Sequence, residues 1–248
     1  SGVAEGSDSP DMNNGEIHSL DFDVYDSQEN HVLLGESINL ANKSFSIGAW
    51  IKLDQLDPVG NASCIFTSGQ GGQGNGLYFY IGNSDSEGNV FLSTAFFGPG
   101  NDLISSEAIS IGDGLWHYAL LTFDNSTKER NMYYDGQLIA NDISSLSFTG
   151  NPQSAIGMTV WNQVDNFDGN ISHFSIWDYP LSNEEASGNP HSIDDDLMCR
   201  FNFSEGSGST LNDVSGNGNH GTIYGATWSD DAPSLFQSNE QEGDRDYQ

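Results

Sequence analysis

Apolar and polar residues alternate along many short stretches of the chain, and turn-forming residues separate one stretch from the next. The clearest example is residues 116–140, which read WHYALLTFDNSTKERNMYYDGQLIA. Successive side chains of residues 119–124 would point to opposite faces of a strand, and polar residues 125–127 interrupt this pattern at a turn. Asp135-Gly136 then starts a second tight turn. These residues therefore predict a β-hairpin followed by a further strand.

The same pattern predicts an all-β fold, a two-sheet antiparallel β-sandwich of the jelly-roll type, with many short strands. One short helix is expected near 182–187, because Ser182 is a good N-cap and Glu185 three residues later completes a capping box. The strands are expected at residues 17–23, 31–34, 44–53, 62–68, 76–82, 89–97, 108–111, 117–124, 131–134, 137–140, 155–158, 170–177, 197–203 and 221–228.

Four blocks of this sequence resemble the laminin-G-like jelly rolls of the concanavalin A-like lectin and glucanase group. They are SLDFD at 19–23, SFSIGAWIKL at 44–53, GNISHFSIWDYPLSNEEA at 169–186 and FNFSEGSGSTLNDVSGNGNHGTIYGATWS at 201–229. The resemblance therefore covers most of the chain. It implies a sandwich that binds sugars or proteins at its rim, often beside calcium, and in which only some relatives are enzymes.

The length of 248 residues is ordinary for one β-sandwich and allows a sizeable core. Residues 1–14 and 234–248 are polar and acidic, so they are expected to be solvated tails or linkers. The sequence thus predicts one laminin-G-like domain over residues 15–233.

The chain carries 36 acidic and six basic residues, which gives a formal charge of −30. This charge repels nucleic acid and anionic membranes, so neither is an expected partner. It is explained either by solubility in salty water or by a surface that binds cations, and both explanations can hold together.

Cys64 and Cys199 are the only cysteines, and no apolar run is long enough to cross a membrane. The simplest interpretation is a mature extracellular fragment, secreted or on the cell surface, that forms one module of a larger protein. Spacing alone leaves open whether the cysteines form a disulfide or remain two buried thiols.

Residues 213–221, DVSGNGNHG, are the strongest candidate for a metal site, because carboxylate, amide and carbonyl oxygens crowd a glycine-rich loop. Asp213 would be a side-chain ligand, and Asn217 and His220 could contribute side-chain or carbonyl atoms. The family resemblance favours calcium here, as a structural or ligand-assisting ion. The alternative is that the glycines serve tight turns and Asp213 caps one of them.

A second acidic loop begins with Asp21 and Asp23 and could complete the same calcium site. The loop is about three residues longer than in the family, which puts a ligand at Asp26 in doubt. An acidic pair of the family is also replaced here by Ser172-His173. Asp168 is the nearest substitute carboxylate.

Trp161 is the best candidate for sugar binding, because the C–H faces of pyranoses stack on aromatic rings. It lies in VWNQVDNFDGN beside Asn162 and Asp165, and Tyr25 and Asp102 lie in other loops that could share a rim. The alternative is that Trp161 ends a strand and packs over the edge of the sandwich. The remaining tryptophans occupy strand or family-core positions and are expected to pack there: Trp50, Trp116, Trp177 and Trp228.

Motifs of the enzymes with this fold are missing from the sequence. No glucanase triplet of the form ExDxxE occurs, and the three arginines are too dispersed to neutralise an acidic sugar. No nucleophile elbow is present either. We therefore expect a non-catalytic extracellular module that binds a glycan or polysaccharide, with calcium shaping the rim.

Two other functions remain open at this stage. The module could be a protein-protein adhesion or spacer unit of a large secreted or surface protein, which an exposed apolar patch would favour. It could also be a jelly-roll glycoside hydrolase or polysaccharide lyase, which would need two carboxylates about 5 to 10 Å apart in a cleft.

Overall fold

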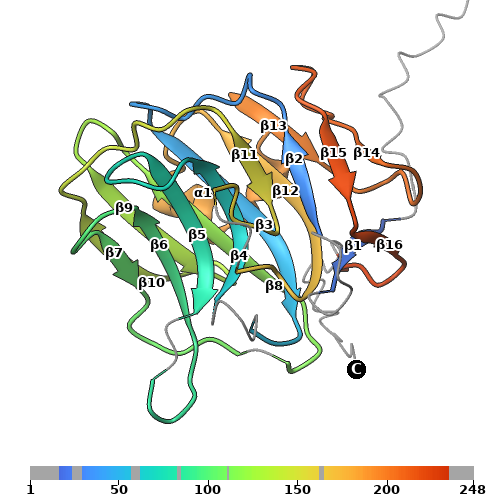
Figure 1. The fold of residues 1–248 in the computed structure, drawn as a ribbon, viewed down its shortest axis with the longest axis horizontal. Helices are drawn as coiled ribbons and strands as arrows, with labels where there is room; N and C mark the ends of the chain where they lie inside the picture. Colours follow the sequence, from blue (N-terminus) through green and yellow to red (C-terminus); the bar gives the residue numbers. More distant parts are fainter. Residues whose placement is uncertain are drawn as a thin grey trace, which may run out of the picture.

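The structure is a computed structural model, and it describes residues 17–23, 30–56, 62–82, 85–110, 112–161 and 165–234 (Figure 1). Two antiparallel sheets of eight strands each face one another. In sheet A the order is β10 (Gln137–Ile143), β9 (Glu129–Tyr134), β8 (His117–Phe123), β3 (Phe45–Leu53), β12 (Gly169–Trp177), β1 (Ser19–Phe22) and β16 (Thr227–Ser229), and β13 (Leu197–Phe201) also pairs with β12.

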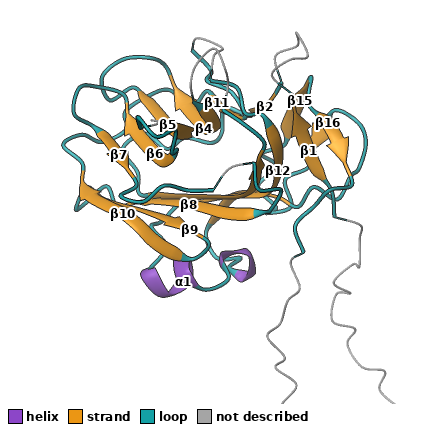
Figure 2. Ribbon diagram, turned by 90° about the horizontal axis from the view of Figure 1, so that it is seen from below, coloured by secondary structure: helices purple, strands orange, loops and turns teal. Residues whose placement is uncertain are grey.

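In sheet B the order is β14 (Thr210–Leu211), β15 (Gly221–Tyr224), β2 (His31–Leu34), β11 (Ser154–Ile156), β4 (Ser63–Gly69), β5 (Gly76–Gly82), β6 (Phe91–Phe96) and β7 (Asp102–Ile104). Figure 2 shows the two sheets stacked, with helix α1 (Asn183–Ser187) outside sheet A. A 3-10 turn, η1 (Pro190–Ser192), follows α1. The predicted all-β sandwich is therefore confirmed.

The inward side chains of both sheets form the core, as the alternation along each strand requires. Phe45 and Phe123 of sheet A have ring centroids 5.4 Å apart, and Phe123 meets Phe96 of sheet B edge to face at 4.7 Å. All three side chains are fully buried. Such aromatic pairs add about 0.5–1.5 kcal/mol each beyond the area that they bury.

The local predictions that depend on turn chemistry are confirmed. Residues 117–143 form β8, β9 and β10, and the turn between the last two has Asp135 and Gly136 at φ 49° and 75°. These angles suit the two-residue hairpin turn that Asp-Gly favours. The N-terminus of α1 has the predicted capping box, in which the Glu185 amide donates to the Ser182 hydroxyl and the Ser182 amide donates to the Glu185 carboxylate.

Two strand predictions are wrong, and two short strands were not predicted. Residues 108–110 form no strand, because only Ile109 makes an isolated bridge, to Val90. Residues 221–228 form two strands in different sheets, since Gly225 at φ 68° turns the chain from β15 in sheet B to β16 in sheet A. Strands β7 and β14 were not expected. They have three and two residues, too few for a visible alternation.

Among the described residues, no helix is long and apolar enough to span a bilayer. Cys64 and Cys199 are both buried and free, so the open question of a disulfide is resolved in favour of two thiols. They lie in different sheets, on β4 and β13. The predicted tails, apart from Ser234, lie outside the described residues.

Candidate ligand-binding site

The segment between β11 and β12 crosses the outer face of sheet B and carries Trp161. The Thr67 hydroxyl of β4 donates to the Met158 carbonyl at 2.9 Å and accepts from the Val160 amide at 3.3 Å. Beyond residues 162–164, the Cys64 amide donates to the carbonyl of Asp165 at 2.9 Å. The described parts of the segment are therefore attached to β4 on both sides of Trp161.

The indole of Trp161 lies close to two glycines. A Cβ added at Gly71 would lie 3.3 Å from Cδ1 of Trp161, and one added at Gly76 would lie 3.3 Å from Cη2. Tyr78 and Phe97 meet the indole edge to face, with centroids at 6.2 and 5.9 Å. These contacts hold the half-buried ring in one orientation, and Phe97 beside it remains 44% exposed.

An open pocket of about 450 Å³ adjoins this ring, and its lining is Gln70, Gly71, Gln153, Val160 and Trp161. The backbone that carries its two glutamines is fixed, because the Gly69 amide donates to the Gln153 carbonyl at 2.7 Å and the Gln70 amide donates to the Asn75 carbonyl at 2.8 Å. The pocket thus presents an aromatic surface and two neutral amides, and none of the described residues that line it is charged.

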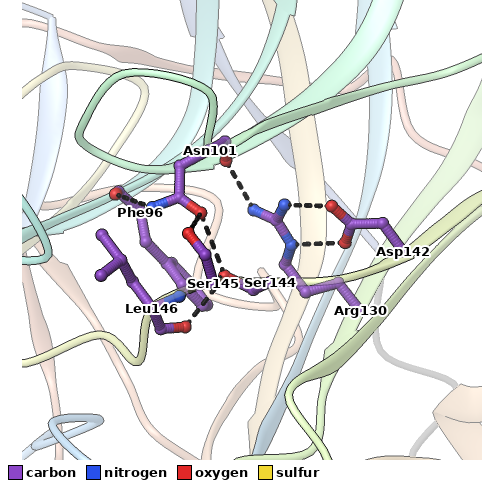
Figure 3. Close-up of polar contacts among 7 residues, drawn as sticks. All are labelled: Phe96, Asn101, Arg130, Asp142, Ser144, Ser145 and Leu146. Carbon is purple, nitrogen blue, oxygen red and sulfur yellow. Dashed lines mark hydrogen bonds and ion pairs between the residues drawn. The ribbon is translucent and has the colours of Figure 1, made fainter.

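A buried arginine supports the turn between β6 and β7 (Figure 3). Arg130 of β9 is 1% exposed and binds both carboxylate oxygens of Asp142 on β10, through Nε at 2.8 Å and Nη2 at 2.6 Å. Its third nitrogen donates to the Asn101 carbonyl at 2.8 Å, and the guanidinium lies 5.3 Å from the centre of the Phe96 ring. Sheet A is thereby joined to the β6–β7 turn of sheet B.

Asn101 extends this network across the turn. Its side-chain amide donates to the Phe96 carbonyl at 3.3 Å, and its side-chain oxygen accepts from the hydroxyls of Ser144 and Ser145 at 3.2 and 3.3 Å. The backbone on both sides of Phe97 is therefore held by side-chain hydrogen bonds.

The other residues predicted for sugar binding are only partly brought together. Asp102 is the exposed first residue of β7 and shares a cross-strand row with Ala95 and Tyr78, on the same face as Trp161, but it does not line the pocket. Asp165 lies near Tyr78, whose pKa is raised by burial and then by Cys64 and Asp165. The remaining two residues, Asn162 and Tyr25, lie outside the described residues.

The carboxylate of Asp213 has a structural role in its loop. It accepts backbone N–H groups from Arg200 at 3.0 Å, Ser215 at 2.9 Å and Asn219 at 2.8 Å. Burial alone would raise its pKa, but these hydrogen bonds hold the pKa below its ordinary value. The observed contacts of Asp213 therefore agree with the alternative interpretation, in which this residue caps a turn.

Asn217 and His220 are also engaged within the protein. The Asn217 amide donates to the Leu197 carbonyl at 2.6 Å, and Nδ1 of His220 accepts from the Asp213 backbone amide at 3.1 Å. The first contact attaches the loop between β14 and β15 to the start of β13, and the second closes the loop on itself.

A separate group of carboxylates lies near the ends of β1, β3 and β12 and includes Asp21, Asp23, Asp54 and Asp168. Burial raises the pKa of Asp21, and Asp54 and Asp23 raise it further. Burial also raises the pKa of Asp168, and the three other aspartates raise it further. A hydrogen bond from the Gln55 side-chain amide at 2.6 Å acts in the opposite direction. These carboxylates repel one another.

The two groups of predicted metal ligands lie at different positions along β12. Asp21 pairs with Asn170 on β12, whereas Asp213 bridges Phe201, which pairs with Phe174 further along β12. Four residues of strand separate these positions by about 13 Å. Within the described part of the chain, no three His, Cys, Asp or Glu side chains are placed to share a metal ion. Asp26 lies outside that part.

Sequence reasoning missed most of the residues around Trp161, namely Gln70, Gly71, Gln153 and Phe97. A signal was present in the polar, glycine-rich run QGGQG at 70–74. Its connection to Trp161 depends on the pairing of β4 with β11, which places Ser68 opposite Ser154. That long-range register is not visible in a local pattern.

Known proteins resemble this chain in sequence over part of its length. The model of the family described as the concanavalin A-like lectin/glucanases superfamily matches residues 26–187. A 135-residue match to the sushi, von Willebrand factor type A, EGF and pentraxin domain-containing protein 1 of Rattus norvegicus is 27% identical and covers 48% of this chain and 4% of the relative. The corresponding mouse protein is 27% identical over 117 residues. The chain spans only a few per cent of the length of these curated relatives.

Solved structures resemble the fold. A proposed carbohydrate binding protein from Bacteroides ovatus has a TM-score of 0.65 and 17% identity, and the match covers 88% of this chain and 61% of that one. A heptameric SAP-like pentraxin from Limulus polyphemus has a TM-score of 0.56 and 14% identity, with 69% and 81% covered. At these identities the likeness concerns the fold alone.

Proposed function

Because this chain belongs to the concanavalin A-like lectin/glucanases superfamily, we propose that it is a non-catalytic module that binds a neutral glycan at Trp161. The observation that carries this proposal is the fixed indole beside a pocket that also holds Gln70 and Gln153. A pyranose ring can stack its C–H face on the indole, while the amides exchange hydrogen bonds with its hydroxyls.

Charge favours a neutral ligand over an acidic one. The chain has a formal charge of −30, and the pocket lining contains no lysine or arginine within the part of the chain that the structure describes. A sulfated or uronic sugar would meet a repulsive field and no charged partner. Uncharged hydroxyl groups do not incur that repulsion.

The arrangement of carboxylates supports a non-catalytic role. Among the residues that the structure describes, no carboxylate lines the Trp161 pocket. Asp124 and Glu129 line a groove on sheet A, where hydrogen bonds from Ser126 lower the pKa of Asp124. A glycosidase needs, inside its cleft, a carboxyl whose pKa is raised so that it can act as a general acid. Asp21 and Asp168 have raised pKa values, but neither is among the described residues that line either pocket.

Calcium assistance stays a prediction. The crowded carboxylates Asp21, Asp23, Asp54 and Asp168 have the chemistry that calcium prefers, but among the described residues no three of them are placed to bind one ion. Extracellular location and membership of a larger protein are likewise part of the proposal, supported by the multidomain relatives.

A protein-protein adhesion module is the second candidate, and one observation favours it. Leu138 and Ile143 of β10 are 46% and 66% exposed, and Ile104 of the nearby β7 is 42% exposed. Exposed apolar side chains on neighbouring edge strands can contact another protein.

The proposal is tested by probing an array of neutral, sulfated and uronic glycans with the purified domain and with the Trp161→Ala variant. We expect the unsubstituted domain to bind neutral glycans, and we expect Trp161→Ala to weaken this binding about tenfold or more. Tyr224→Ala is the matched control, because Tyr224 is also a 46% exposed aromatic residue of sheet B but lies on β15, away from the pocket.

Two further outcomes separate the parts of the proposal. Loss of binding in EDTA supports the calcium prediction, and unchanged binding in EDTA removes calcium while the Trp161 site stands. Failure to bind any glycan on a broad array contradicts the proposed function and favours the adhesion module.

A further inference from the structure

A second groove lies on the outer face of sheet A, on the opposite side of the molecule from Trp161. It has a volume of about 520 Å³ and runs between strands β8 to β10 and the loop 180–183 that leads into α1. Figure 2 shows this helix outside sheet A, below β8, β9 and β10. The volume is within the roughly 300–1,000 Å³ that is typical of small-molecule sites.

Polar side chains form a row across the floor of this groove. Thr122 pairs with Asn131, and Asn131 pairs with Asn141, so the three side chains lie on one face of neighbouring strands. Asn183 faces them from the wall formed by the start of α1. Asn141 and Asn183 are exposed, and neither side chain forms a hydrogen bond with another residue in the described ranges.

An apolar surface lies next to these amides. Leu138 of β10 is 46% exposed and sits opposite the buried Tyr133, and both line the groove. The groove also holds the carboxylates of Asp124 and Glu129, and its described lining includes no lysine or arginine. Free amides, carboxylate acceptors and an apolar patch together suit a molecule with hydroxyl groups on an apolar ring.

We propose that this groove is a second saccharide-binding site, in which Asn141 and Asn183 bind the hydroxyls of a neutral oligosaccharide. The inference rests on the proposed function for its ligand class, but its residues and its sheet are different. Since the two sites lie on opposite outer faces of the sandwich, one module would hold two glycan chains at once. A module that binds two chains of one polysaccharide network at the same time is held in that network more tightly than a module with either site alone.

The test is a calorimetric titration of the domain with cellohexaose, xylohexaose, mannohexaose and laminarihexaose, followed by NMR of the asparagine side-chain amides. Five proteins are compared: the unsubstituted domain, Trp161→Ala, the double variant Asn141→Ala/Asn183→Ala, the triple variant that combines these three substitutions, and the control Asn189→Ala. Asn189 is an exposed asparagine of the same segment, forms no side-chain cap and does not line the groove.

We expect two molecules of sugar per domain, and one in either Trp161→Ala or the double variant. The triple variant should bind sugar at least about tenfold more weakly than Trp161→Ala does. In the unsubstituted domain, the side-chain amide signals of Asn141 and Asn183 should shift on binding. One sugar per domain, abolished by Trp161→Ala and unchanged by the double variant, overturns the groove but leaves the proposed function. Binding that survives Trp161→Ala and is lost in the double variant supports the groove and refutes the Trp161 site. Absence of binding to all four sugars overturns the groove for neutral oligosaccharides, and the glycan array then decides the proposed function separately.

Discussion

Replacing Asp142 with alanine should destabilise the protein more than replacing Arg130 with methionine, although arginine is the larger side chain. The reason is the unequal burial of the pair, since Arg130 is 1% exposed and the Asp142 side chain is 33% exposed. Without Asp142 the guanidinium remains buried and keeps only its bond to the Asn101 carbonyl. Without Arg130 the carboxylate of Asp142 can be hydrated.

The magnitudes follow from this difference. Removing one partner of a buried ion pair costs about 3–5 kcal/mol, and the partial exposure of Asp142 favours the lower end, so Asp142→Ala should cost about 3 kcal/mol. Arg130→Met replaces the pair by an apolar side chain beside Phe96 and should cost about 1–2 kcal/mol. For a domain of this size, about 3 kcal/mol lowers the melting temperature by roughly 6–12 °C.

The assay is urea unfolding, followed by tryptophan fluorescence, for both single variants and the double variant. The double variant should be more stable than Asp142→Ala alone, because it contains no unpaired buried charge. If Arg130→Met proves the more destabilising substitution, or if the two effects simply add, the reasoning from unequal burial is refuted.

Three further predictions follow from buried groups. Burial and the nearby Arg200 lower the pKa of His173 to about 4. Burial, His173 and Arg200 lower the pKa of His191 to about 3. Both histidines therefore stay neutral in the folded state. The unfolded state binds these protons first, so stability should fall as the pH drops from about 6.5 towards 4, by about 1–2 kcal/mol for each histidine at pH 5. Urea midpoints measured at pH 7 and 5 check this, and a slope that is equally steep in His191→Phe would contradict it. Asp213→Ala should lower the free energy of unfolding in urea by about 2–3 kcal/mol, because three backbone N–H groups lose their acceptor. A cost below about 0.5 kcal/mol, roughly the effect of a surface substitution, would show that these N–H groups find another acceptor. The thiols of Cys64 and Cys199 are buried with raised pKa values, so a thiol reagent should modify them only on unfolding and a reductant should leave the melting temperature unchanged.

Elements with local causes could be predicted from the sequence. The hairpin that ends at Asp135-Gly136 and the capping box of Ser182 and Glu185 each depend on a few adjacent residues, and both form as expected. The hydrophobic alternation likewise identified most strands of both sheets.

The candidate site could be predicted only in part, because its residues come from distant strands. Trp161 stood out as an aromatic residue in a polar loop, but Gln70 and Gln153 meet it only through the pairing of β4 with β11. The loop of Asp213 shows a different difficulty. A carboxylate among glycines suits a loop that binds a cation, and it equally suits a turn in which backbone N–H groups bind the carboxylate. Only the folded structure shows that Asp213 accepts backbone N–H groups.

The central claim is that Trp161 contacts the sugar, and fluorine NMR of the domain labelled with 5-fluorotryptophan measures this most directly. The chain has five tryptophans, and the Trp161 signal is identified as the one missing from Trp161→Phe. During titration with the strongest neutral glycan from the array, the account predicts that the Trp161 signal shifts in a saturable manner while the other four stay in place. A glycan that binds without moving the Trp161 signal would contradict the account.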